Sequence, residues 1–179
     1  KNLFLQKSFS KFNKQYLAFK NKYKKSKWSI KMISNKASKS LLDVKINSTR
    51  TIGDQIYNLY SKQTVKIETH NNKIKDYRVI DEKSILSSQN SLLNVKLISP
   101  EKVLTGERYE INLIIESPLD NSLTASGMIL IKDNEKMKIS NDLFNITPDQ
   151  SGGLFKYIQA PLEPGSQTIS AIITHPEGI

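Results

Sequence analysis

The first part of the chain carries its apolar side chains at the period of an α-helix. Between residues 5 and 23, large apolar residues recur at intervals of three or four, and two isoleucines continue the series. The members of this stripe are Leu5, Phe9, Phe12, Tyr16, Phe19, Tyr23, Ile30 and Ile33. No glycine or proline precedes Gly53, so no helix breaker interrupts the pattern. The pattern predicts a basic segment over residues 1–40 that forms one amphipathic helix.

From residue 41 the pattern changes to the two-residue period of a β-strand. Val44 and Ile46 alternate with polar residues, as expected for a strand that is buried on one face. The strand candidates lie at residues 41–46, 55–60, 65–68 and 76–79. Residues 70–73 read His-Asn-Asn-Lys and predict a turn, because asparagine tolerates positive φ. Residues 41–91 are therefore predicted to form a β-meander that ends in a Ser-rich linker over 81–91.

A second group of short strands is predicted after this linker. The strand candidates lie at residues 92–99, 109–115, 128–131, 154–160 and 167–174, with a hairpin return at 137–139 and a short strand or helical turn at 143–146. The turn candidates lie at residues 105–107, 118–122, 133–134 and 161–165. Short strands with turn signals about every 8–12 residues are typical of a β-sandwich rather than of a βαβ fold.

The C-terminal half also has a resemblance to a known family. A strand follows Gly153, a Pro-Gly corner occupies residues 161–165, an alternating strand reads Thr-Ile-Ser-Ala, and a turn ends at Gly178. In this arrangement residues 92–179 resemble bacterial immunoglobulin-like and fibronectin-like modules, with residues 97–109 similar to their first strand and turn. The resemblance implies an immunoglobulin-like β-sandwich that works by binding or assembly.

The sequence departs from that family pattern in two places. Gln167 and Thr168 stand where a corner tyrosine is frequent, and the sequence reaches Ile179 where the final strand of such a module is expected. The resemblance therefore implies an incomplete sandwich in a fragment of a longer chain. The predicted fold class is mainly β, with an N-terminal basic amphipathic α-helix, antiparallel β-strands and an immunoglobulin-like sandwich in the C-terminal half.

The positive charge is concentrated at the start of the chain. The formal net charge is +10, yet residues 1–40 contain 12 lysines and no acidic residue, whereas the remainder has 15 basic and 17 acidic side chains. Lysines outnumber arginines 24 to 3, a bias that an AT-rich genome also produces. The candidate contacts for an anionic surface are Lys7, Lys11, Lys14, Lys20, Lys24, Lys25, Lys27 and Trp28. Such a positive balance is typical of proteins that contact membranes, nucleic acids or acidic partners.

Three interpretations of the helix remain open. Its aromatic stripe packs on the following strands, or it lies in the headgroup plane of an anionic membrane, or its lysines contact nucleic acid or an acidic protein. Lysines near an anionic leaflet contribute about 1 kcal/mol each, and Trp28 suits an interfacial position. Base stacking requires exposed aromatic residues, which a regular stripe disfavours.

No residue pattern indicates catalysis. Cysteine is absent, which excludes disulfides and thiolate chemistry, and His70 and His175 each stand in a predicted turn without a second ligand at metal spacing. The sequence contains no phosphate-binding loop and no nucleophile elbow. We therefore expect no catalytic, cofactor-binding or metal-binding residue, no small-molecule substrate and no enzyme activity.

These observations favour a non-enzymatic binding or structural module. The expected location is extracytoplasmic or peripheral to a membrane, with an anionic membrane surface or a protein as partner. The alternative is a cytoplasmic scaffold or nucleic-acid-associated protein that uses the lysine-rich helix. Assigning binding from a β-sandwich is an argument by analogy, because a fold alone does not define a function.

Overall fold

A computed structural model describes residues 3–91, 93–116, 124–131, 147–149 and 153–174. The chain divides into two compact units, Lys1–Gln89 and Asn90–Ile179, called unit 1 and unit 2 below. The fold is mainly β, with one N-terminal helix followed by antiparallel strands, as the sequence predicted. The helix and the meander, which were expected as separate segments, belong to the same unit.

Unit 1 begins with helix α1 (Gln6–Lys22), which is shorter than predicted. The N–H of Tyr23 still donates to the carbonyl oxygen of Phe19 at 2.9 Å, but Tyr23 itself is extended, with φ −119° and ψ 96°. Lys20 and Lys22 lie in the last turn, where cations interact favourably with the helix dipole. The helix therefore ends well before Ile33.

The residues that follow form strand β1 (Lys25–Lys36), so the prediction of one helix through this segment was wrong. Ile30 and Ile33 fit the helical spacing, but Trp28, Ile30 and Met32 also alternate with Lys27, Ser29 and Lys31. The strand wins because β1 pairs with the next strand along nearly its whole length. Pairing with a neighbour is information that a local helical period does not contain.

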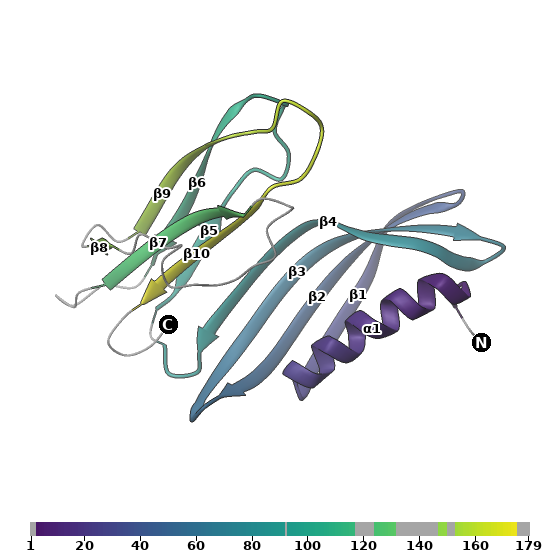
Figure 1. Cartoon of the computed structure of the whole chain (residues 1–179), viewed down its shortest axis with the longest axis horizontal. Coiled ribbons are helices and arrows are strands. Elements are labelled where there is room, and N and C mark those ends of the chain that lie inside the picture. Colours follow the sequence, from purple (N-terminus) through teal and green to yellow (C-terminus); the bar gives the residue numbers. More distant parts are fainter. Residues whose placement is uncertain (1–2, 92, 117–123, 132–146, 150–152, 175–179) are drawn as a thin grey trace. The chain divides into compact units, whose positions relative to one another are not determined.

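Four long antiparallel strands make the sheet of unit 1, in the order β1-β2-β3-β4 (Figure 1). The three strands that follow β1 are β2 (Lys39–Ile52), β3 (Gln55–His70) and β4 (Lys73–Ser88). The predicted turn at residues 70–73 is confirmed, and Asn71 and Asn72 have φ values of 48° and 58°. Gly53, with φ 58°, serves the β2–β3 turn in the same way.

Two further expectations for this sheet were wrong. The strand candidates at 55–60 and 65–68 are one continuous strand, β3, and the proposed linker over 81–91 lies largely within β4. Its serines are not linker residues, because Ser88 is buried and the Ser84 hydroxyl donates to Ser61 Oγ at 2.8 Å. These small polar side chains belong to the sheet, although the serine content of residues 81–91 had predicted a linker.

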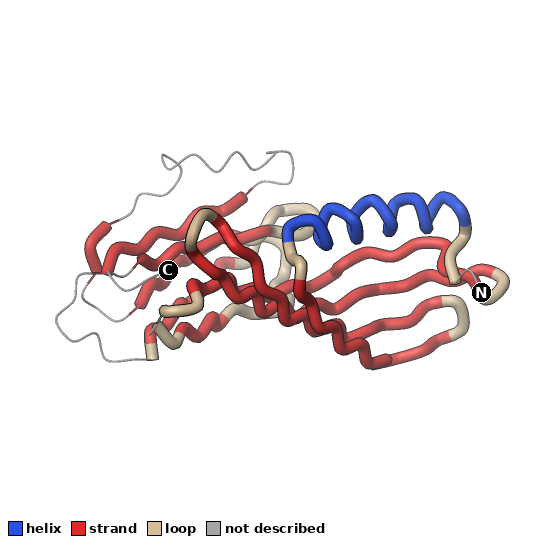
Figure 2. The backbone as a smooth tube through the Cα atoms, turned by 90° about the horizontal axis from the view of Figure 1, so that it is seen from below, coloured by secondary structure: helices blue, strands red, loops and turns tan. Residues whose placement is uncertain are grey.

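Helix α1 lies along one face of this sheet (Figure 2). The ring centroids of Phe12 and Tyr77 are 6.0 Å apart and those of Phe19 and Trp28 are 5.3 Å apart, both edge to face. Beneath the helix, Val44 and Ile46 of β2 are buried. Phe12 and Phe19 of the aromatic stripe thus pack on the sheet, as the first of the three interpretations expected, whereas Phe9 and Tyr16 are 43% and 39% exposed.

The described residues of unit 2 form two three-stranded antiparallel sheets with the orders β5-β6-β9 and β10-β7-β8. The strands are β5 (Val95–Ile98), β6 (Arg108–Ile115), β7 (Thr124–Ile131), β8 (Thr147–Asp149), β9 (Gly153–Gln159) and β10 (Thr168–Thr174). Both sheets contribute to the core, where Ile111, Ile158 and Ile173 are buried. The predicted strands at 109–115, 128–131, 154–160 and 167–174 are confirmed to within a few residues.

Some expectations for unit 2 fall on residues outside the described ranges. They are the turns at 118–122 and 133–134, the strands at 137–139 and 143–146, and the final turn at 175–178.

Gln167 fills a structural role at the corner before β10. Its Oε1 accepts a hydrogen bond from the Tyr109 hydroxyl at 2.9 Å, and its Nε2 donates to the Gln159 carbonyl at 3.1 Å. Burial raises the pKa of Tyr109 above its ordinary value, so the phenol remains a neutral donor. The side chain at the position where the family pattern favours a tyrosine therefore links the start of β10 to β6 and β9.

Candidate functional site

The two units differ sharply in charge. Unit 1 contains 20 Lys and Arg against six Asp and Glu, a formal balance of +14, and unit 2 contains seven against 11, a balance of −4. Residues 41–89 supply eight of those basic side chains. Because residues 41–89 also hold all six acidic side chains, residues 1–40 supply +12 of the +14, as the sequence analysis assigned. The structure divides these residues between α1, β1 and the start of β2.

Strand register decides which side chains of the sheet point away from the helix. Trp28 and Tyr77 touch helix side chains, so they mark the helix-facing side. Directly paired residues in antiparallel strands point to the same side, and Trp28 is in register with Ile46, which pairs with Ser61. Their immediate neighbours along each strand therefore point to the outer face, because side chains alternate.

Three lysines lie abreast on this outer face. Lys45 of β2 pairs with Lys62 of β3, which pairs with Lys83 of β4. Side chains paired in this way have Cβ atoms about 4.5–5.5 Å apart, and like charges directly opposite one another are destabilising. The row therefore concentrates positive charge on three neighbouring strands at some expense in stability.

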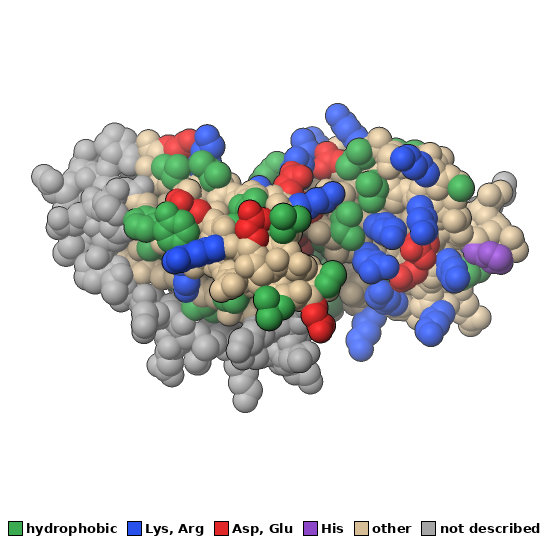
Figure 3. Space-filling model, turned by 90° about the horizontal axis from the view of Figure 1, so that it is seen from above, with side chains coloured by type: hydrophobic (Ala, Val, Ile, Leu, Met, Phe, Trp, Pro, Cys, Tyr) green, Lys and Arg blue, Asp and Glu red, His purple; other side chains and the backbone are tan. Residues whose placement is uncertain are grey.

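Further basic residues surround this row on the same face. The lysine face comprises Lys25, Lys27, Lys31, Lys36, Lys39, Lys45, Lys62, Lys66, Arg78 and Lys83. Four acidic residues share it: Asp43, Glu68, Asp76 and Asp81. Two of them are engaged within unit 1, since Glu68 is 3.6 Å from Lys66 Nζ and Asp76 is 3.6 Å from Lys11 Nζ. Figure 3 shows Lys and Arg side chains gathered over unit 1 around a small acidic group.

Two uncharged side chains stand beside the lysine row. Tyr60 pairs with Ile85 in the next row, and their exposed fractions are 44% and 37%. With Leu41, which pairs with Lys66, the outer face therefore combines lysines with one aromatic side chain and more than one aliphatic side chain. This mixture is typical of surfaces that meet a membrane interface.

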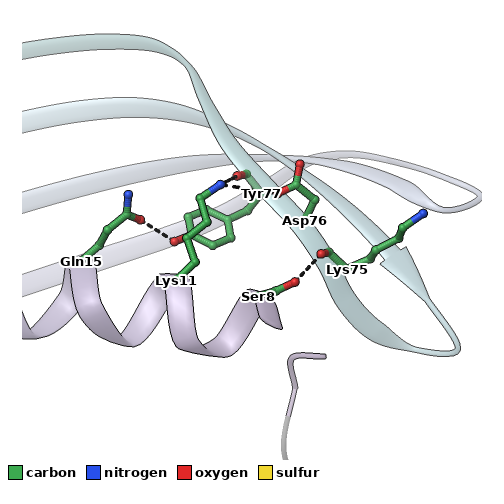
Figure 4. A network of polar contacts seen from close by, with 6 residues as sticks. All are labelled: Ser8, Lys11, Gln15, Lys75, Asp76 and Tyr77. Atoms are coloured by element: carbon green, nitrogen blue, oxygen red, sulfur yellow. Dashed lines mark hydrogen bonds and ion pairs between the residues drawn. The ribbon is translucent and has the colours of Figure 1, made fainter. Parts of the chain in front are cut away.

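On the opposite face, polar contacts fasten the helix to β4 (Figure 4). Lys11 Nζ lies 4.9 Å from the centre of the Tyr77 ring, and at the β4 edge of the sheet it also reaches the carboxylate of Asp76, which the register places on the outer face. The Tyr77 hydroxyl donates to Gln15 Oε1, and the Ser8 hydroxyl donates to the Lys75 carbonyl. Burial raises the pKa of Tyr77 above its ordinary value, and the Asp76 carboxylate raises it further. Tyr77 is thus held as a neutral donor.

The eight residues predicted as anionic-surface contacts are not brought together. Lys7 and Lys14 are exposed on the helix, two turns apart, and Lys20 is also exposed there. Lys11 is engaged with Asp76 and Tyr77.

The other four predicted contacts follow the helix. Lys24 lies between α1 and β1, and Trp28 packs on Phe19. Only Lys25 and Lys27 belong to the lysine face. Sequence reasoning missed its centre, Lys45, Lys62 and Lys83, because Lys62 and Lys83 fell outside the predicted strands and because the register between strands was not visible.

Other kinds of site find no support in the described ranges. No group of three or more His, Asp or Glu side chains among them is arranged to hold a metal ion. The part of the chain that the structure describes contains no helix that is long and apolar enough to cross a membrane.

The fold and the site define a mainly β protein in which a cationic helix-and-sheet unit precedes a β-rich unit. Residues 90–179 match a family described as a domain of unknown function (DUF8623), and the chain belongs to this family. The matched residues coincide with unit 2. Comparison with curated proteins and with solved structures finds no match.

Proposed function

We propose that this protein is a non-enzymatic binding module that attaches to an anionic membrane surface through the lysine face of unit 1. The observation that carries the proposal is the row of Lys45, Lys62 and Lys83 across three strands. Like charges directly opposite one another repel, whereas an anionic surface turns the same row into a favourable contact. The location that fits is extracytoplasmic or peripheral to a membrane.

The magnitudes are adequate for reversible attachment. Each lysine near an anionic leaflet contributes about 1 kcal/mol, so five lysines supply about 5 kcal/mol. That corresponds to sub-millimolar affinity, which Tyr60 and Ile85 increase if they enter the headgroup region. Because this attraction is screened within about 10 Å at moderate ionic strength, attachment depends strongly on salt.

The packed helix favours the sheet over α1 as the contact. An amphipathic helix binds membranes by burying its apolar face among lipids. Here Phe12 and Phe19 of that face already pack on Tyr77 and Trp28. Releasing the helix for insertion would expose Val44 and Ile46 beneath it, so we assign the contact to the lysine face.

Nucleic acid is the alternative partner, in a cytoplasmic scaffold, and the outer face fits it less well. Binding to single strands relies on several aromatic side chains that stack with successive bases. Among the described residues of the sheet, the outer face carries one aromatic side chain, Tyr60. Lysine is a point charge that suits a diffuse anionic surface, whereas arginine is favoured for bidentate phosphate recognition.

For unit 2 we propose an immunoglobulin-like sandwich that contributes protein interactions. In that fold the first, second and fifth strands (A, B and E) share one sheet, while strands C and F lie in the other. The order β5-β6-β9 matches the first set, and β7 next to β10 matches the second. This order supports the proposal, which the family description leaves open.

The proposal is tested by sedimentation of the full chain with phosphatidylcholine vesicles that contain or lack phosphatidylserine. The variant Lys45→Gln/Lys62→Gln/Lys83→Gln is compared with Lys7→Gln/Lys14→Gln/Lys20→Gln, which removes the same charge from the helix. We expect the sheet variant to lose about 100-fold in affinity, since three lysines contribute about 3 kcal/mol, and the helix variant to lose much less.

Three outcomes would contradict the proposal. Equal binding to vesicles without phosphatidylserine excludes an electrostatic contact. A larger loss in the helix variant moves the contact to α1. Tighter binding to single-stranded RNA than to vesicles, at equal phosphate concentration and equal salt, favours the nucleic-acid alternative.

A further inference from the structure

Strand β1 is an open edge of the sheet in unit 1. One side of β1 pairs with β2, and within the described part of unit 1 no strand pairs with its other side. Along its 12 residues, Ser34 alone is half-buried and the others are exposed. An edge of this length presents backbone N–H and C=O groups that can pair with another strand.

The two faces of β1 present different chemistry to an incoming strand. Trp28, Ile30 and Met32 point to the helix-facing side and are 42%, 60% and 63% exposed. Lys27 and Lys31 point to the outer face and are exposed as well. A strand laid beside β1 would therefore meet apolar side chains on one face and cations on the other.

The opposite edge of the sheet differs from β1. Leu5 N–H donates to the Ile74 carbonyl at 2.9 Å and Ile74 N–H donates to the Leu3 carbonyl at 2.8 Å, so the N-terminal segment occupies part of the β4 edge. Ile80 and Lys75 of β4 also bulge out of the pairing with β3. Occupation and bulges are both devices that block edge pairing. Over residues 25–32, strand β1 has no bulge, and no described segment of unit 1 pairs with its open edge.

We propose that β1 binds an extended segment of a partner protein in which acidic and apolar residues alternate. The backbone of the segment pairs with the open edge of β1, its carboxylates lie opposite Lys27 and Lys31, and its apolar side chains lie beside Trp28, Ile30 and Met32. Main-chain hydrogen bonds supply affinity in this mode, and alternate side chains supply specificity. The inference rests on β1 alone and is independent of vesicle binding.

A second copy of this chain is a poor occupant of the same edge. Two β1 strands placed side by side bring the lysines of one outer face next to those of the other. Like charges opposed in this way disfavour pairing, which is how edge lysines prevent self-association. An acidic segment converts those repulsions into attractions.

The test uses the isotope-labelled full chain and a peptide of alternating Glu and Val that matches the 12 residues of β1. We expect saturable binding, with amide shifts and exchange protection centred on β1. A peptide of identical composition with all Glu before all Val is the matched control and should bind much more weakly. Two further peptides, N-methylated at every Val or at every Glu, each block one edge of the peptide, so one of them should lose binding.

Variants separate this site from the lysine face. The variant Lys27→Gln/Lys31→Gln should lower the affinity for the alternating peptide several-fold. The variant Lys62→Gln/Lys83→Gln, with the same change in charge, should leave that affinity nearly unchanged. The proposal is wrong if the control peptide with all Glu before all Val binds as well as the alternating peptide, or if both methylated peptides do. Binding would then depend on charge alone and not on strand pairing. It is equally wrong if the shifts map to other strands, if no peptide binds, or if the unliganded chain dimerises through β1.

Discussion

The two units of this protein use β-sheets in different ways. Unit 1 has strands of 12–16 residues, and its buried hydrophobic residues are Val44 and Ile46, among those described. Among its described residues, unit 2 has strands of three to eight residues and buries five apolar side chains, four of them in strands of its two sheets. Unit 1 packs its helix on one face of the sheet and places exposed and half-buried lysines on the other. The comparison teaches that the sheets of unit 2 serve mainly to enclose a hydrophobic core. The sheet of unit 1 also carries a charged outer face that is not needed for such a core.

The core of unit 2 provides the largest expected effect. Ile111 is 1% exposed, so Ile111→Ala leaves a cavity and should lower the free energy of unfolding of unit 2 by about 2–5 kcal/mol. Amide hydrogen exchange measures this for each unit separately. Unit 1 should keep its protection and its vesicle affinity. A comparable loss in both units would contradict their description as separate cores.

In unit 1 the helix is the main cover of the sheet, and a smaller effect is expected there. Phe12 stacks between Phe4 and Tyr16 and meets the edge of Tyr77, but it is only half-buried. Phe12→Ala should therefore destabilise unit 1 by about 1–2 kcal/mol, below the value for a fully buried phenylalanine. Phe9→Ala is the control, since Phe9 is 43% exposed. Equal losses in both variants would mean that the helix packs differently.

The smallest expected effect is a change in the pH dependence of unit 1. Burial and Asp76 raise the pKa of Tyr77 above 10.0, so the folded state favours the neutral phenol. The resulting stability is fully present below pH 10 and is lost as the pH rises through the higher folded pKa. Tyr77→Phe should remove this alkaline dependence. Urea titrations of both proteins at neutral and alkaline pH measure it, and identical slopes would contradict the assignment.

The sequence allowed the class of the fold to be predicted, but not the extent of every element. Alternation identified parts of β2, β3 and β4, and the Asn-Asn turn was readable from local chemistry. Strand β1 was misread as helix because Ile30 and Ile33 satisfy a helical period, and only pairing with β2 decides between the two. The serines of β4 looked like a linker because composition does not reveal burial.

The candidate site shows the same limit more strongly. Only Lys45 lay in a predicted strand, whereas Lys62 fell between two strand candidates and Lys83 fell in the predicted linker. A single sequence also does not state which strands are neighbours or in which register. The lysines of residues 1–40 attracted attention because they are contiguous in sequence. Long-range pairing, rather than local density, produces the charge row on the sheet.

The most direct test of the central claim is the variant Lys62→Glu, because Lys62 lies between Lys45 and Lys83. It replaces two repulsive pairs by attractive ones, so unit 1 should become more stable by about 0.5–1 kcal/mol in urea. At the same time its affinity for phosphatidylserine vesicles should fall about 30-fold, since two positive charges are lost at the surface. Higher stability together with weaker binding is the predicted result. Lower stability with unchanged vesicle affinity would contradict the assignment of the lysine face as the contact surface.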